Sequence, residues 1–104
     1  MLRRRYEILL PLRYNDGRPM SDEAIGQTRE ELLARFDGVS FTPHPIQGSW
    51  VHEGVRYDDS STKVIVDADD TPEVRQFFYE FKLILRERFE QIEIYIVSFP
   101  LDVI

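Results

Sequence analysis

Residues 62–73, TKVIVDADDTPE, contain the strongest fold signal in this sequence. The first half, Thr62 to Asp67, is a strand in which Val64-Ile65-Val66 is apolar on both faces. A strand of this kind is typical of the centre of a sheet, where both faces are covered. The second half begins a helix, because Thr71 is a good N-cap and Pro72 suits the first helical position. The stretch therefore predicts a central strand that leads directly into a helix.

The chain after residue 73 predicts a long amphipathic helix and a final strand. Apolar side chains recur at helical spacing up to about Phe89 and form one wide stripe. Residues 91–99 then alternate as a strand does, with Ile92, Ile94 and Ile96 on one face, and Pro100 is expected to end this strand. The expected helical stripe consists of Val74, Phe77, Phe78, Phe81, Ile84 and Leu85.

The residues before 62 predict a strand, a helix and a hairpin. Residues 6–12 alternate between apolar and other side chains, as a half-buried strand does. Ser21 is a good N-cap for a helix over 22–36, which Gly38 can end in a left-handed conformation. Residues 46–52 and 55–57 are expected to pair around a two-residue Glu53-Gly54 turn. We interpret residues 58–61 as a loop.

The expected elements follow the order strand, helix, strand, strand, helix, strand. This βαββαβ order is the ferredoxin-like arrangement, in which two helices pack on one face of an antiparallel sheet. The strands should lie in the order fourth, first, third, second, with a possible extra hairpin between the middle strands. We therefore expect an α+β fold and a single domain over residues 1–104, a length that gives room for one core.

Charge and composition narrow the classes of partner. The chain has 19 acidic and 13 basic side chains, a net charge of −6, which repels nucleic-acid phosphates. We interpret its one basic cluster, Arg3-Arg4-Arg5, as a solvated terminus. An RNA-recognition domain of this strand order needs aromatic side chains on its central strands, where this chain has Glu7, Leu9, Lys63 and Ile65. We expect no nucleic-acid partner.

The sequence indicates neither a membrane protein nor an exported one. No apolar stretch approaches the ~20 residues of a membrane span. The apolar residues 8–12 are too few for the core of a signal peptide. Cysteine is absent, which excludes disulfides and thiol catalysis. A cytoplasmic location without membrane contact is the expectation.

The sheet face away from the helices is expected to be apolar, which is unusual for a monomer. A homo-oligomer would cover this face, with a dimer as the simplest form. A ring trimer, the C-terminal residues 101–104 folded back, or the loop 41–49 are the alternatives. The expected interface residues are Leu9, Ile65, Tyr95, Val97 and Phe99.

The hairpin around Trp50 is the best place to look for a ligand site. Trp50 and Tyr57 can face each other across the hairpin, a pair that stabilises a sheet by ~0.5–1 kcal/mol. An aromatic pair beside an acid can equally line a small-molecule pocket. The ligand-binding candidates are Trp50, His52, Tyr57, Asp58 and Lys63.

No motif for metal or cofactor chemistry is present. His44 and His52, the only histidines, lack a metal-binding spacing. Asp69 and Asp70 have a sufficient role at the start of the second helix, and Asp58-Asp59 is typical of a turn. We expect no metal and no cofactor, and the sequence assigns no catalytic residue.

Several short motifs span most of the chain. They are Asp16-Gly17, Ser21-Asp22, Arg35-Phe36-Asp37-Gly38, Gly48-x-Trp50, Gly54, Asp58, Lys63-Val64 and Arg88-Phe89-x-Gln91. In these motifs the sequence resembles a family of short bacterial α+β proteins classed only as a domain of unknown function. The resemblance implies the same ferredoxin-like fold and brings no activity or site residue.

Together these observations favour a non-catalytic, homo-oligomeric interaction or ligand-sensing module. The alternative is a small enzyme whose site lies among Trp50, His52, Tyr57 and Asp58, with His52 or Asp58 as general base at a subunit interface. A metal-dependent nuclease that uses Asp16 is a further alternative, which the net charge disfavours.

Overall fold

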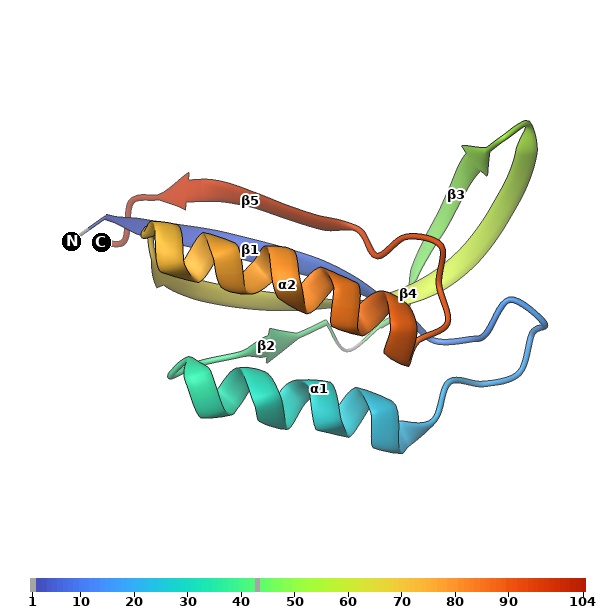
Figure 1. Cartoon of the computed structure of the whole chain (residues 1–104), viewed down its shortest axis with the longest axis horizontal. Coiled ribbons are helices and arrows are strands. Elements are labelled where there is room, and N and C mark those ends of the chain that lie inside the picture. Colours follow the sequence, from blue (N-terminus) through green and yellow to red (C-terminus); the bar gives the residue numbers. More distant parts are fainter. Residues whose placement is uncertain (1, 43) are drawn as a thin grey trace.

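The computed structural model describes residues 2–42 and 44–104. A five-stranded antiparallel sheet carries both helices on one face (Figure 1). The strand order β2-β4-β1-β5, with β3 also paired to β4, is the predicted ferredoxin-like α+β fold. The elements are β1 (Arg3–Pro11), α1 (Asp22–Arg35), β2 (Ser40–Phe41), β3 (Ile46–His52), β4 (Val55–Asp69), α2 (Pro72–Arg88) and β5 (Ile96–Leu101).

The central strand β4 is longer than the sequence predicts. It runs without a break for 15 residues, so the expected loop at 58–61 is wrong. These residues pair with β3, where Ser49 lies opposite Asp58 and Ile46 opposite Ser61. The partner strand satisfies their backbone groups, and this outweighs the turn preference of an Asp-Asp-Ser-Ser run. From Ser61 onward β4 also pairs with β1 on its other side.

A two-stranded hairpin, here called the arm, stands off the rest of the molecule (Figure 1). It consists of β3 and residues 55–60 of β4. β2 and β3 lie on the same side of β4, because Ser61 pairs with β1 on one side and with β3 on the other. The turn at Glu53-Gly54 is confirmed, since both residues have positive φ, 50° and 79°. Two left-handed residues are typical of a type I′ hairpin turn.

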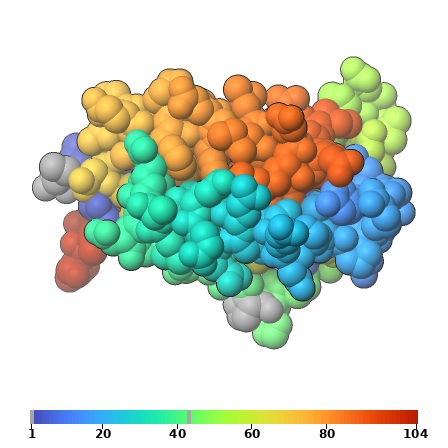
Figure 2. Space-filling model, turned by 60° about the horizontal axis from the view of Figure 1, so that its bottom comes forward, coloured from blue at the N-terminus to red at the C-terminus, as the bar shows by residue number. Residues whose placement is uncertain are grey.

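The core lies between the sheet and the two helices. Figure 2 shows α1 and α2 side by side. Both predicted N-caps are confirmed: Ser21 accepts a hydrogen bond from the Ala24 N–H, and Thr71 accepts one from the Val74 N–H. In the part of the chain that the structure describes, no helix is long and apolar enough to cross a membrane. The largest fully buried side chains are Phe89, Ile8, Leu10, Leu32, Leu85, Ile94, Val64 and Val66.

The structure corrects three details at the element ends. β5 begins at Ile96 rather than at residue 91, and Ile92 is exposed outside it. Pro100 lies within β5, because an edge strand tolerates a residue without an N–H. α1 ends at Arg35, and the next residue, Phe36, is extended, so Gly38 does not form the expected left-handed cap.

Candidate functional site: the open sheet face and the arm pocket

The open face is the sheet surface away from the helices, made by the odd-numbered side chains of β1, β4 and β5. The strand registers place its side chains in rows. Each row runs from β4 through β1 to β5: Ile65, Glu7 and Val97; Asp67, Arg5 and Phe99; Asp69, Arg3 and Leu101. Leu9 lies opposite Lys63 at the end nearer the arm.

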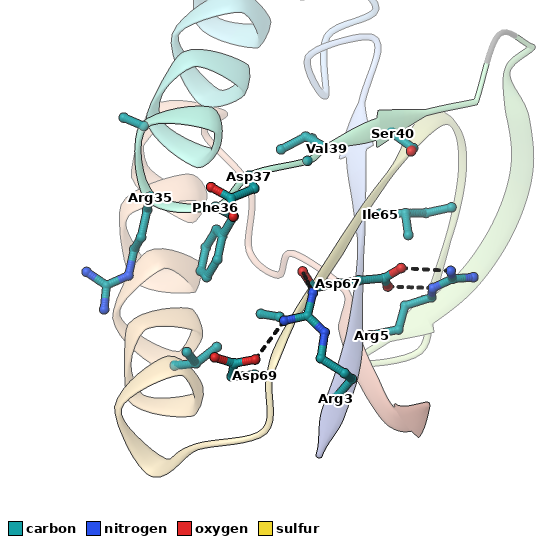
Figure 3. Close-up of a pocket in the computed structure, with 14 residues that line it drawn as sticks. Arg3, Arg5, Arg35, Phe36, Asp37, Val39, Ser40, Ile65, Asp67 and Asp69 are labelled. Atoms are coloured by element: carbon teal, nitrogen blue, oxygen red, sulfur yellow. Dashed lines mark hydrogen bonds and ion pairs between the residues drawn. The ribbon is translucent and has the colours of Figure 1, made fainter. Parts of the chain in front are cut away.

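Three ion pairs cross the open face between β1 and β4. Arg5 donates to both carboxylate oxygens of Asp67, at 2.7 and 3.0 Å, and the Arg3 guanidinium lies 2.7 Å from Asp69 (Figure 3). Lys63 Nζ lies 3.5 Å from Glu7. The hydrogen bonds from Arg5 lower the pKa of Asp67 below its ordinary value. Arg3 and Arg5 are therefore paired parts of the sheet, and the interpretation as a solvated terminus is wrong.

Apolar side chains fill the rest of the open face. Leu9, Ile65 and Val97 are half-buried by their neighbours, while Phe99 remains 40% exposed. Tyr95 is 60% exposed and precedes β5, although its carbonyl accepts a hydrogen bond from the Leu9 N–H at 3.0 Å. All five expected interface residues therefore lie on or beside this face.

The two segments expected to cover the open face from within the chain do not do so. Phe41 forms β2 and packs against the core, with the Arg29 guanidinium 4.6 Å from its ring centroid. Ile46 begins β3. Beyond β5, Val103 and Ile104 are exposed. The open face therefore keeps its apolar side chains uncovered by either segment.

The arm is stabilised by a stacked aromatic pair and by an aspartate that accepts a hydrogen bond from it. Trp50 and Tyr57 stack across the hairpin with ring centroids 4.7 Å apart. The Trp50 indole donates from Nε1 to Asp59 Oδ2 at 3.1 Å. Gly48 makes room for that carboxylate, because a Cβ there would lie 2.9 Å from Asp59 Oδ1. The Gly48-x-Trp50 motif is thus explained by the contact with Asp59.

The arm pocket is a cavity of about 280 Å³ between the arm and the loop that follows β1. Trp50, Tyr57 and Asp58, three of the five ligand candidates, line it. His52 and Lys63 do not: His52 Nε2 lies 3.8 Å from Glu53, and Lys63 pairs with Glu7 on the open face. The pocket residues that the sequence did not suggest are Pro11, Arg13, Tyr14, Asn15, Gly17, Gln47, Asp59, Ser60 and Gln91.

The electrostatics of the arm pocket do not favour acid–base chemistry at Asp58. Its carboxylate accepts a hydrogen bond from the Ser49 hydroxyl at 2.6 Å and one from Arg56 Nε at 2.8 Å. The Ser49 hydrogen bond, followed by the Arg56 contact, lowers the pKa of Asp58. A carboxylate with a lowered pKa is a weaker general base. Asp58 is better suited to accept hydrogen bonds from a ligand than to remove a proton.

An open groove of about 990 Å³ lies where β4 extends beyond the end of β2 (Figure 3). Arg3 lies in this groove and donates from Nη2 to the backbone carbonyl of Asp67 at 3.1 Å. Arg35 approaches from α1, with its guanidinium 4.6 Å from the Phe77 ring centroid. Among residues 2–42 and 44–104, no group of three His, Asp or Glu side chains is placed to hold a metal ion.

No family model and no curated protein sequence matches this chain. Solved structures share its fold. CutA1 from Oryza sativa aligns with a TM-score of 0.66 and 11% identity, over 99% of this chain and 83% of its own. A divalent cation tolerance protein, CutA1, from Thermus thermophilus aligns with a TM-score of 0.66 and 16% identity, over 97% of this chain and 85% of its own.

A phage SAM lyase in complex with S-methyl-5′-thioadenosine aligns with a TM-score of 0.70 and 14% identity, over 97% of this chain and 90% of its own. At such identities the likeness shows the fold alone. It agrees with the ferredoxin-like α+β architecture described above, whereas the resemblance to a bacterial family of unknown function stays a prediction.

Proposed function

We propose that this chain is a homo-oligomeric ligand-binding module whose subunits meet through the open face. The observation that carries the proposal is the apolar group Leu9, Ile65, Val97 and Phe99 on a sheet face that both helices leave bare. Burial of such surface contributes ~25 cal/mol per Å² before the costs of association are subtracted. The ion pairs of the same face are already neutralised within one subunit, so they bring no net charge to the contact.

Contact through the face is favoured over contact through the edge of β5 or the part of β4 beyond β2, because a proline or an arginine contact obstructs each of these edges. On β5, the Leu9–Tyr95 hydrogen bond makes the odd-numbered residues face β1, so Ser98 and Pro100 face outward. Pro100 offers no N–H to an added strand. On β4, the outward carbonyl of Asp67 already accepts from Arg3. Blocked edges of this kind prevent strand addition.

The oligomer is tested by sedimentation velocity on the wild type, Ile65→Glu and Leu83→Glu. Ile65→Glu places an unpaired carboxylate in the buried contact, so the assembly should fall to a lower mass with an unchanged circular dichroism spectrum. Leu83 is 61% exposed on α2, so the same substitution there should leave the mass unchanged. A wild type that is monomeric at tens of micromolar would contradict the proposal.

The ligand half of the proposal concerns the arm pocket, whose aromatic pair, amides and carboxylates suit a small neutral molecule. S-methyl-5′-thioadenosine is a suitable first probe, because a structure of the same fold was solved with it. Trp50 is the only tryptophan of the chain, so its fluorescence reports on the pocket. Saturable quenching is expected, with at least a tenfold loss of affinity in Tyr57→Leu. Tyr79→Leu, on the exposed side of α2, is the control.

The two outcomes of the ligand experiment separate binding from catalysis. Recovery of the unchanged probe after long incubation would support the binding module. Chromatographic conversion of the probe by the wild type, abolished in Asp58→Asn, would favour the small enzyme. If the fluorescence shows no saturable change up to about millimolar probe, ligands of the S-methyl-5′-thioadenosine class are excluded for the arm pocket.

A further inference from the structure

The outer edge of β3 is the unprotected edge of the arm. Leu12 N–H donates to the Ser60 carbonyl on the β1 side of β4, while Thr42 N–H donates to the Lys63 carbonyl on the opposite side. β4 therefore uses its odd-numbered residues to bond β3. With Trp50 opposite Tyr57 and Gly48 opposite Asp59, the backbone groups of Gln47, Ser49 and Val51 point away from β4.

β3 lacks the features that keep strand edges from pairing. Its sequence, IQGSWVH, contains no proline, lysine, arginine, aspartate or glutamate. Natural edge strands are usually protected by such residues or by a covering segment. The contrast lies within one molecule, because β5 carries Pro100 and the free part of β4 is covered by Arg3.

We infer that β3 pairs antiparallel with β3 of a second copy, about a two-fold axis at Ser49. The contact joins two arms into a four-stranded ribbon, β4-β3-β3-β4. It goes beyond the proposed open-face contact, uses a different surface and does not depend on it. A two-stranded ribbon on its own is marginal in water, and the added strands supply the missing neighbours.

The hydrogen-bond directions limit the register of this pairing, because outward-pointing residues must lie opposite one another. An axis at Ser49 pairs all three outward residues of β3: Ser49 faces the partner's Ser49, and Gln47 faces the partner's Val51. No like charges meet. Val51, 68% exposed in the single chain, gains the aliphatic part of a glutamine as a neighbour.

The same register completes the arm pocket with a residue from the partner. Trp50 of each copy lies opposite Gly48 of the other, in a pair whose side chains approach closely. An aromatic side chain beside a strand glycine covers backbone that the glycine leaves bare. Gly48 has no side chain of its own at this position, and a Cβ there would lie 2.9 Å from Asp59 Oδ1. The partner's Trp50 therefore joins the wall of the pocket next to Asp59.

Single-cysteine cross-linking tests the register directly, since the chain has no cysteine. In Ser49→Cys the two thiols meet at the axis, where directly paired Cα atoms lie about 5.5 Å apart, within disulfide range. Mild oxidation should convert most of the protein into a covalent dimer. The control Gln47→Cys, at another exposed position of β3, places its thiols four residues apart, about 13 Å along the strand, and should cross-link at least tenfold more slowly. Equal rates for the two variants would overturn the inference.

A second variant tests the backbone contact. Ser49→Pro removes an outward N–H that the hairpin itself does not use, whereas Ser49→Ala keeps it. Arm pairing, measured as the dissociation constant from sedimentation in the Ile65→Glu background, should weaken at least tenfold in Ser49→Pro alone. Ile65→Glu removes the open-face contact. Cross-linking of Ser49→Cys in that background therefore reports on the arm contact alone and is expected whether or not the subunits meet through the open face. If Ser49→Pro unfolds the arm, the cysteine pair decides the question.

Discussion

Three consecutive arginines at the start of β1 make three different contacts. Arg3 pairs with Asp69 and covers the edge of β4. Arg5 forms an ion pair with Asp67. Arg4 points to the opposite side of the sheet, where it donates a hydrogen bond to Asp70 at 3.0 Å. The alternation of side chains along a strand separates the neighbours in this way. Their partners lie more than sixty residues away in the chain, so local sequence reasoning could not find them.

The Arg5–Asp67 pair should make part of the stability depend on pH. The lowered pKa of Asp67 contributes stability that is present above the unfolded value of about 4 and is lost as pH falls through the folded value. Arg5→Gln should raise the pKa of Asp67, as NMR titration can measure. The gap in unfolding free energy between wild type and Arg5→Gln should shrink from pH 7 to about pH 2. An equal gap at both pH values would show that the pair contributes nothing.

Tyr6 carries a buried hydroxyl without a hydrogen-bond partner in the part of the chain that the structure describes. Its ring stacks on Phe78 at 3.9 Å, and this packing does not need the hydroxyl. Tyr6→Phe should therefore be neutral or should raise the free energy of unfolding by up to about 1 kcal/mol, because it removes an unsatisfied polar group. Urea denaturation measures the change. A loss of about 1 kcal/mol or more would mean that the hydroxyl has a partner.

At the scale of elements, the residues at the starts of the helices made the helices predictable. Ser21, Thr71 and Pro72 act within one turn of chain, so their effect is readable locally. The strands were harder, because their extent depends on partners distant in sequence. Residues 58–61 became strand because β3 lies beside them, and residues 91–95 stayed irregular although they alternate. The arm pocket was half predictable for the same reason: Trp50 and Tyr57 share a hairpin, whereas Arg13 and Gln91 reach it through the fold.

α2 offers a test of which apolar side chains are buried. The helical stripe predicted from sequence includes Phe81 and Ile84, but Phe81 is 2% exposed and Ile84 is 49% exposed. Phe81→Ala should lower the free energy of unfolding by about 3–5 kcal/mol, as truncation of a buried aromatic does. Ile84→Ala should cost less than about 1 kcal/mol, because half of its side chain is already in water. Similar losses for the two variants in urea denaturation would mean that the orientation of α2 is wrong.

The whole molecule divides into a packed body and an arm outside its core. No residue of the arm belongs to the buried hydrophobic cluster, although the two parts share β4. Local openings with few buried apolar contacts need little free energy. The body should therefore fold without the arm, and the arm should exchange its amide hydrogens first in a dissociated subunit.

An arm-shortened variant tests this division. Replacing residues 49–58 by Asn-Gly closes a two-residue turn between Gly48 and Asp59, which already face each other. The urea midpoint of the body should change little, because no residue of the arm belongs to the buried hydrophobic cluster. A variant that no longer unfolds cooperatively would show that the arm is needed for the fold.

Because β4 is one uninterrupted strand, its pairing in the body determines which side of the arm each β4 side chain faces. A slip of β4 by one residue would turn Val64 and Val66 away from the core, where both are fully buried. The arm has no hydrophobic core of its own that would determine the side on which Trp50 lies. Two valines in the body therefore determine on which surface of the arm the indole is displayed. Substitutions in the arm can change what is presented there while its direction stays the same.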